Sequence, residues 1–135
     1  MYQKIIVSLA LDHGIGQKAI EAALKLKSEG AEIIAVHVHE PLQGSVSGAY
    51  MPEDAAQTAV KNAKEQLAER LTGIPDIKAV LLKGHSGRAI TNYADEIGAD
   101  CIIVGSHKPG LADYFLGSTA ARVVRHAPCS VHVLR

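Results

Sequence analysis

Short apolar segments alternate with segments of helical periodicity along the whole chain. Five apolar runs, rich in Val and Ile, have the length and continuity typical of strands that are buried on both faces of a parallel sheet. The runs are KIIVSLAL (4–11), AEIIAVHV (31–38), IKAVLLK (77–83), DCIIVGS (100–106) and CSVHVL (129–134).

Four segments with a 3.6-residue period separate these runs and predict amphipathic helices. We expect Gly30 to stop the first helix, and the second covers about residues 52–71. The third is expected to start at Ser86 as its N-cap and to stop before Gly98. Pro128 is expected to end the fourth.

Strict alternation of strands and helices predicts the fold class. Parallel strands joined by helical crossovers form an α/β fold with helices on both faces of the sheet, a doubly wound, Rossmann-like arrangement of three layers, α/β/α. The chain has 135 residues, which is a common size for one domain, so we expect residues 1–135 to form a single domain.

Composition and charge narrow the classes of function. Fourteen basic residues balance fourteen acidic ones, which argues against a surface for nucleic acid. No apolar run approaches the roughly 20 residues of a membrane helix, and the start of the chain has no signal-peptide pattern. Cys101 and Cys129 form no CxxC motif, so we expect no disulfide framework, a buried thiol at Cys101 and a cytoplasmic protein.

The carboxyl ends of the predicted strands carry most of the candidate chemistry, because open α/β sheets bind ligands at that edge. The richest segment there is GSHKPGLADYFLGST, residues 105–119. Gly117, Ser118 and Thr119 open the last helix, whose first N–H groups can hold an anion, and Lys108 can add a charge. A Gly-Pro turn followed by a serine cap explains the same residues without a ligand.

Other residues near the strand ends permit weaker hypotheses. His37 and His39 share one face of a strand and suggest a metal site, although histidines of the core or rim are the simpler interpretation. Asp12 can bind ribose hydroxyls or cap a turn. Ser106 and His107 are adjacent and have no orienting acid, so the sequence predicts no enzymatic mechanism.

The whole chain resembles the universal stress protein family. The resemblance is carried by KIIVSLAL, VHVHEP, KGHSGRAI and above all GSHKPGLADYFLGSTAARVVRHAPCSVHVLR. It implies a five-stranded parallel sheet of order 3-2-1-4-5, similar to the adenine nucleotide alpha hydrolases. In the nucleotide-binding branch of the family, a G-x2-G-x9-G-[ST] signature holds the phosphates and ribose of ATP.

The resemblance also implies roles for individual residues. Gly105 matches the first signature glycine, and Gly117 with Ser118 matches its end, followed by Thr119 on the phosphate side. Val38 falls on an adenine contact, and Gly84 on a position that lines the base. The full set of nucleotide-binding residues implied is Leu9, Ala10, Asp12, Val38, Gly84, Val104, Gly105, His107, Lys108, Pro109, Gly110, Gly117, Ser118 and Thr119.

The sequence departs from the family pattern at two places. Lys108 replaces the middle glycine, one residue closer to Gly117 than in the signature, so that Gly110 must supply the flexibility that Pro109 removes. The acidic residue that usually ends the first strand is replaced by Ala10, and Asp12 is the nearest carboxylate.

The resemblance implies a regulatory protein more than a catalyst. It implies a homodimer through the last strand, Ser130–Leu134, that binds ATP, ADP or AMP with Mg²⁺ or Mn²⁺ carried on the phosphates. Slow ATP hydrolysis or autophosphorylation is the most activity we expect, and a membrane transporter is one kind of partner. The alternative is a nucleotide-free interaction module of the same family.

Overall fold

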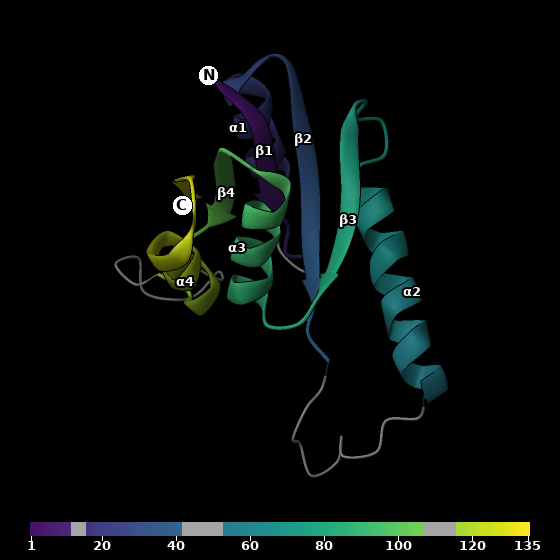
Figure 1. The fold of residues 1–135 in the computed structure, drawn as a ribbon. Coiled ribbons are helices and arrows are strands. Elements are labelled where there is room, and N and C mark those ends of the chain that lie inside the picture. Colours follow the sequence, from purple (N-terminus) through teal and green to yellow (C-terminus); the bar gives the residue numbers. More distant parts are fainter. Residues whose placement is uncertain (12–15, 42–52, 107–115) are drawn as a thin grey trace.

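Five parallel strands form one sheet in the order β3-β2-β1-β4-β5, which confirms the expected fold class and topology (Figure 1). The computed structural model describes residues 1–11, 16–41, 53–106 and 116–135. The strands are β1 (Tyr2–Ser8), β2 (Lys27–His39), β3 (Ile77–Lys83), β4 (Cys101–Gly105) and β5 (Ser130–Leu134). The chain order reverses between β1 and β4, which makes the carboxyl ends of these two strands the topological switch point.

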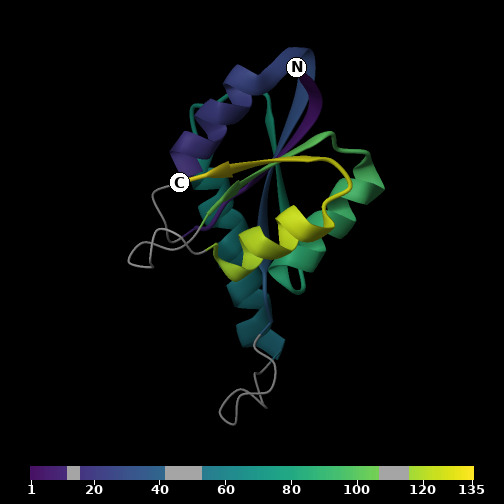
Figure 2. The same ribbon diagram turned by 90° about the vertical axis from the view of Figure 1, so that its left-hand side faces the viewer.

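In the described part of the chain, four helices join the strands and cover both faces of the sheet (Figure 2). They are α1 (Gly16–Leu26), α2 (Glu53–Arg70), α3 (Ser86–Ile97) and α4 (Ser118–His126). Buried residues of α1 and α2 share one apolar cluster with one face of the sheet, and those of α3 and α4 share a second cluster with the other face. The result is a Rossmann-like α/β/α arrangement of three layers.

Alternation along the central strands explains why their sequences are continuously apolar. On β1, Ile5 and Val7 point into the α1 and α2 cluster, whereas Ile6 between them points into the α3 and α4 cluster. Ile102 and Ile103 of β4 divide in the same way. Because both faces are covered by helices, the central residues of these strands, Ile5–Val7 and Cys101–Ile103, are all apolar and fully buried.

Several predicted boundaries differ from the structure. Helix α1 ends at Leu26, and Gly30 lies within β2, where its φ of 77° suits glycine. The first strand ends at Ser8, three residues earlier than the apolar run suggests. Ser86 is the first residue of α3 and not its N-cap, which is His85.

Three other predicted features are confirmed: the end of α3, the end of α4 and the buried thiol at Cys101. Gly98 ends α3 in the left-handed conformation, with a φ of 70°. Helix α4 ends at His126, two residues before Pro128. Cys101 is a fully buried free thiol, and Cys129 is a half-buried one. No helix in the described ranges is long and apolar enough to cross a membrane.

Candidate functional site

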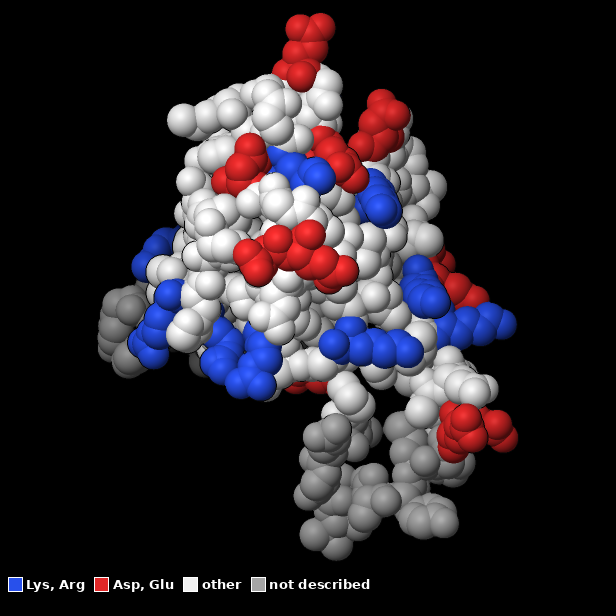
Figure 3. All heavy atoms as spheres, viewed as in Figure 1, with Lys and Arg blue, Asp and Glu red and all other residues white. Residues whose placement is uncertain are grey.

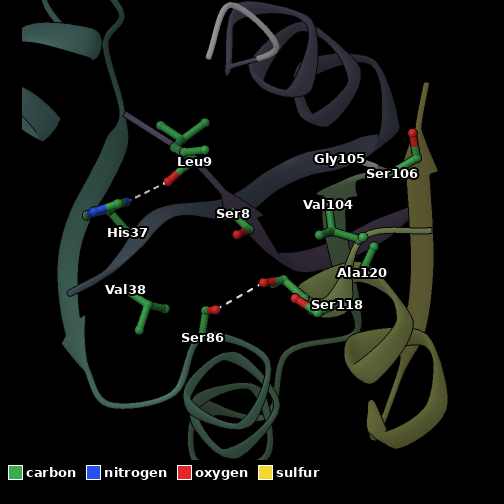
Figure 4. Close-up of a pocket in the computed structure, with 13 residues that line it drawn as sticks. Ser8, Leu9, His37, Val38, Ser86, Val104, Gly105, Ser106, Ser118 and Ala120 are labelled. Atoms are coloured by element: carbon green, nitrogen blue, oxygen red, sulfur yellow. Dashed lines mark hydrogen bonds between the residues drawn. The ribbon is translucent and has the colours of Figure 1, made fainter. Parts of the chain in front are cut away.

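A cavity of about 230 Å³ lies at the carboxyl ends of β1, β2 and β4, where they meet the first turn of α4 (Figure 4). Its position at the reversal of strand order is the place where open α/β sheets bind ligands. Its volume is just below the range of about 300–1,000 Å³ that is common for small-molecule sites. The lining residues are Ser8, Leu9, Ala10, His37, Val38, Ser86, Val104, Gly105, Ser106, Gly117, Ser118, Thr119 and Ala120.

The segment after β1 is fixed to β2 by two hydrogen bonds. The backbone N–H of Leu9 donates to the carbonyl of Val36 across 2.8 Å, and the Nδ1 of His37 lies 2.8 Å from the carbonyl of Leu9. Because a carbonyl oxygen only accepts, His37 carries a proton on Nδ1. The backbone that enters the cavity from β1 is therefore held on both sides of Leu9.

The start of α4 brings to the cavity backbone N–H donors that have no partner within their own helix. Gly117 is the N-cap, and its carbonyl accepts from Ala121 N–H across 2.9 Å, the first bond of the helix. The N–H groups of the first turn have no acceptor within their own helix, and Ser118, Thr119 and Ala120 belong both to this turn and to the lining. This part of the cavity is therefore suited to an anionic group.

The helix start is joined to the end of β4 through the backbone. The N–H of Gly117 donates to the carbonyl of Ser106, whose own N–H donates to the carbonyl of Leu134 across 2.7 Å. These bonds place the two ends of the glycine-rich segment, Gly105 and Gly117, on the same cavity wall. The intervening residues 107–115 are outside the described part of the chain.

A chain of side-chain hydrogen bonds connects three elements at one side of the cavity. Ser86 donates to Oε1 of Glu40 from both its backbone N–H, at 2.8 Å, and its hydroxyl, at 2.7 Å. The hydroxyl of Ser86 also lies 3.0 Å from that of Thr119 (Figure 4). The backbone N–H of Ser86, followed by its hydroxyl, lowers the pKa of the Glu40 carboxyl, so this group is ionised at neutral pH.

Close packing of α3 against α4 brings the last two hydroxyls together. A Cβ on Gly87 would lie 2.8 Å from the Cβ and 2.6 Å from the Cδ of Arg122, distances that real Cβ atoms do not adopt. The absence of a side chain at Gly87 thus permits the two helices to approach each other. The contact lies close to the two hydroxyls, because Gly87 follows Ser86 directly and Arg122 is three residues after Thr119.

The structure brings eight of the fourteen expected site residues together in the cavity lining. They are Leu9, Ala10, Val38, Val104, Gly105, Gly117, Ser118 and Thr119. Gly84 is outside the lining, in the turn before α3, where its φ is 125° and its N–H donates to the carbonyl of His39. The other expected residues, Asp12, His107, Lys108, Pro109 and Gly110, are outside the described part of the chain.

Five lining residues were absent from the expected set: Ser8, His37, Ser86, Ser106 and Ala120. The sequence draws attention to His37, Ser86 and Ser106 for other reasons: His37 as a rim or metal-binding histidine, Ser86 as a helix cap, and Ser106 as a hydroxyl beside His107 without an orienting acid. The position of His37 at the end of β2, beside Val38, was the available signal. Within the described ranges, no three His, Cys, Asp or Glu side chains are grouped so that they could hold a metal ion.

Charges are distributed unevenly on the face shown in Figure 3. Lys and Arg side chains extend across the lower half, toward the carboxyl ends of the strands, whereas Asp and Glu gather mainly in the upper half and near the lower end of α2. The overall charge is zero, so this separation gives the end of the molecule that holds the cavity a local excess of positive charge on this face.

Comparison with known proteins identifies the family. The model of the universal stress protein family matches residues 1–135. The chain belongs to this family. A universal stress protein of Thermus aquaticus is 30% identical over 138 residues, covering 100% of both chains. The universal stress protein YxiE of Bacillus subtilis is 31% identical over 152 residues, again covering 100% of both.

Solved structures of universal stress proteins share the fold. Universal stress protein UspA of Lactobacillus plantarum superposes with a TM-score of 0.70 at 23% identity, covering 99% of this chain and 98% of that one. A protein of Archaeoglobus fulgidus solved with dAMP gives 0.63 at 19% identity, covering 99% and 98%. A family member from Arabidopsis thaliana with AMP bound gives 0.61 at 18% identity, covering 98% and 90%.

Proposed function

We propose that this universal stress protein binds an adenine nucleotide, as ATP, ADP or AMP, in the cavity at the ends of β1 and β4. The observation that carries the proposal is that the first turn of α4, whose N–H groups have no partner within the helix, lines one cavity together with Gly105 and Gly117. The AMP and dAMP in the two structural relatives support the choice of an adenine nucleotide.

The lining divides into a part for phosphate and a part for the nucleoside. The first turn of α4, with the hydroxyl of Ser118, would bind the phosphates, and the apolar side chains of Leu9, Val38 and Val104 would contact the base and ribose. Asp12, Gly84, His107, Lys108, Pro109 and Gly110 remain expected contacts or neighbours of the nucleotide. Mg²⁺ or Mn²⁺ would be held mainly by the phosphates, which need no dedicated protein cage for such an ion.

The proposed role is regulatory. In the described part of the chain, the lining holds hydroxyls, one imidazole and no carboxylate, so His37 is the single side chain there that could act as a general base, and no acid orients it. Slow hydrolysis or autophosphorylation is therefore the most turnover we expect. We further propose a cytoplasmic homodimer that pairs through Ser130–Leu134 and responds to nucleotide by acting on a partner, of which a membrane transporter is one kind.

Nucleotide extraction and calorimetry test the proposal. The purified protein is denatured, the supernatant is chromatographed for released nucleotide, and ATP and AMP are titrated calorimetrically with Mg²⁺ present. We expect bound or titratable adenine nucleotide in the wild type. Gly117→Leu should abolish binding, because its side chain would fill the approach to the first turn of α4, while Val124→Leu, on an exposed position of the same helix, should bind normally.

Two results would contradict the proposal. No released nucleotide and no heat at millimolar ATP would favour the nucleotide-free interaction module. Full affinity in Gly117→Leu would place the nucleotide elsewhere on the molecule. Thermal unfolding of each variant shows whether the fold is kept.

A further inference from the structure

The hydrogen bonds between Glu40, Ser86 and Thr119 have a fixed direction. An ionised carboxylate only accepts hydrogen bonds, so the hydroxyl of Ser86 must donate its single proton to Glu40, across 2.7 Å. The oxygen of Ser86 can then only accept from Thr119, across 3.0 Å. The proton of Thr119 therefore points toward Ser86, and the lone pairs that remain on Thr119 are acceptors.

The ionisation of Glu40 maintains this direction over the ordinary range of pH. Two donors from one residue, the N–H and the hydroxyl of Ser86, bind the same carboxylate oxygen and stabilise its charged form. The carboxylate stays ionised down to pH values below its ordinary pKa of 4.5. The direction of the chain is thus a property of the structure near neutral pH.

The adjacent hydroxyl, on Ser118, has the opposite character. Both Ser118 and Thr119 line the cavity, but within the described residues Ser118 makes no side-chain hydrogen bond and its proton is available to a ligand. Phosphate oxygens are acceptors, so they suit Ser118 and the N–H groups of α4. The same oxygens would face only lone pairs at Thr119, since its proton is already used.

We propose that the Thr119 hydroxyl is an acceptor subsite for an uncharged N–H or O–H donor on the nucleoside part of the ligand, with its polarity set by Glu40 through Ser86. The inference rests on the proposed nucleotide function, and it replaces the expectation that Thr119 contacts phosphate. Val38 lies two residues before Glu40. Val38 and Ser86 both line the cavity and are near each other in the view of Figure 4. An adenine placed against Val38 would bring its exocyclic amine to the side of the cavity that holds Ser86 and Thr119. A ribose hydroxyl is the other donor available on the nucleoside.

The experiment compares nucleotides that differ by one donor. AMP, IMP, 2′-deoxy-AMP and 3′-deoxy-AMP are titrated calorimetrically into the wild type, Thr119→Val and Thr119→Ser. IMP replaces the amine with a carbonyl oxygen, which would meet the lone pairs of Thr119. We expect the wild type to prefer AMP over IMP by about tenfold or more. Thr119→Val should reduce this ratio several-fold, and Thr119→Ser, which keeps the hydroxyl, should retain it.

Glu40→Gln tests the direction of the chain directly. Its amide can donate to Ser86, after which Ser86 can donate to Thr119 and Thr119 can donate into the cavity. The hydroxyl of Thr119 then becomes able to bind the carbonyl of IMP. We expect AMP binding to persist in Glu40→Gln while the preference for AMP over IMP decreases several-fold. Variants that keep the carboxylate should keep this preference.

The outcomes separate this inference from the proposed function. If Thr119→Val changes the ratio of affinities for AMP and the deoxy-AMPs but leaves the ratio for AMP and IMP constant, the acceptor subsite is supported and assigned to a ribose hydroxyl. Thr119→Val that leaves every ratio unchanged, including one that weakens AMP, IMP and both deoxy-AMPs alike, would overturn the subsite while nucleotide binding stands. A wild type that binds none of these nucleotides would overturn the proposed function as well.

Discussion

At the scale of single residues, burial determines the chemistry of the two thiols. Cys101 is fully buried at the start of β4, and desolvation, with smaller contributions from Cys129 and Asp100, raises its pKa to about 11. Burial also raises the pKa of Cys129, which is only half-buried. Since the thiolate is the reactive form, both thiols are weak nucleophiles near neutral pH.

The difference in burial between Cys101 and Cys129, together with their raised pKa values, predicts the order and pH dependence of their alkylation. In the native protein at pH 8, iodoacetamide should modify Cys129 before Cys101, and Cys101 should react only at the rate of unfolding. The raised pKa of Cys101 in the folded protein favours its thiol form, which is also the form present in the unfolded chain at neutral pH, so the shift does not change the free energy of unfolding there. As the pH rises above the pKa of the unfolded chain, about 8.5, only the unfolded state ionises and the free energy of unfolding decreases. Peptide mass spectrometry over time checks the order, and rapid modification of Cys101 in folded protein would contradict it.

At the scale of elements, the approach of α3 to α4 depends on the missing side chain of Gly87. Alanine is favoured over glycine inside helices by about 1 kcal/mol, so a Gly→Ala change normally stabilises. At Gly87, however, the new Cβ would overlap the Cβ and Cγ of Arg122, at 2.8 and 2.9 Å, which belong to the rigid base of that side chain. Helix α4 must therefore move away from α3.

Gly87→Ala should lower the free energy of unfolding by about 1–3 kcal/mol in spite of its better helix propensity. It should also lengthen the contact between Ser86 and Thr119 and reduce the preference for AMP over IMP. Gly16→Ala is the matched control, because its Cβ would meet Leu9 and Arg70 at ordinary distances of 3.4 and 3.6 Å. Urea unfolding of both variants measures the difference, and equal stabilities would contradict the role given to Gly87.

The elements were largely predictable from the sequence, because each central strand and each helix buries a local apolar pattern. The boundaries were less so: Lys27–Gly30 has no apolar character, yet it extends β2 through pairing that includes Tyr2 with Lys27. The hydrogen bonds around Ser86 were not predictable. They join residues 46 and 33 positions away, and only the sheet topology and the packing of α3 on α4 bring those partners together.

At the scale of the whole molecule, the order of the strands leaves β5 at one edge of the sheet. Alternation alone predicts parallel strands with helices on both faces, whereas the order 3-2-1-4-5 came from the family resemblance.

In the pairing of β5 with β4, Leu134 is opposite Gly105, and its carbonyl accepts from Ser106 N–H. Backbone groups alternate in direction along a strand, so those of Ser130, His132 and Leu134 face β4. Those of Val131 and Val133 face outward, where a second copy of the chain can pair.

This geometry gives a test of the proposed dimer that leaves the protomer folded. Val133→Pro removes an N–H that points outward, and proline is tolerated on an edge strand when that position faces away from the sheet. We therefore expect Val133→Pro to be folded but monomeric by light scattering. His132→Pro removes an N–H that points toward β4, so it should destabilise the protomer itself. If Val133→Pro remains as dimeric as the wild type, the two copies pair through a surface other than β5, and if the wild type is monomeric, the edge of β5 is open to a different partner.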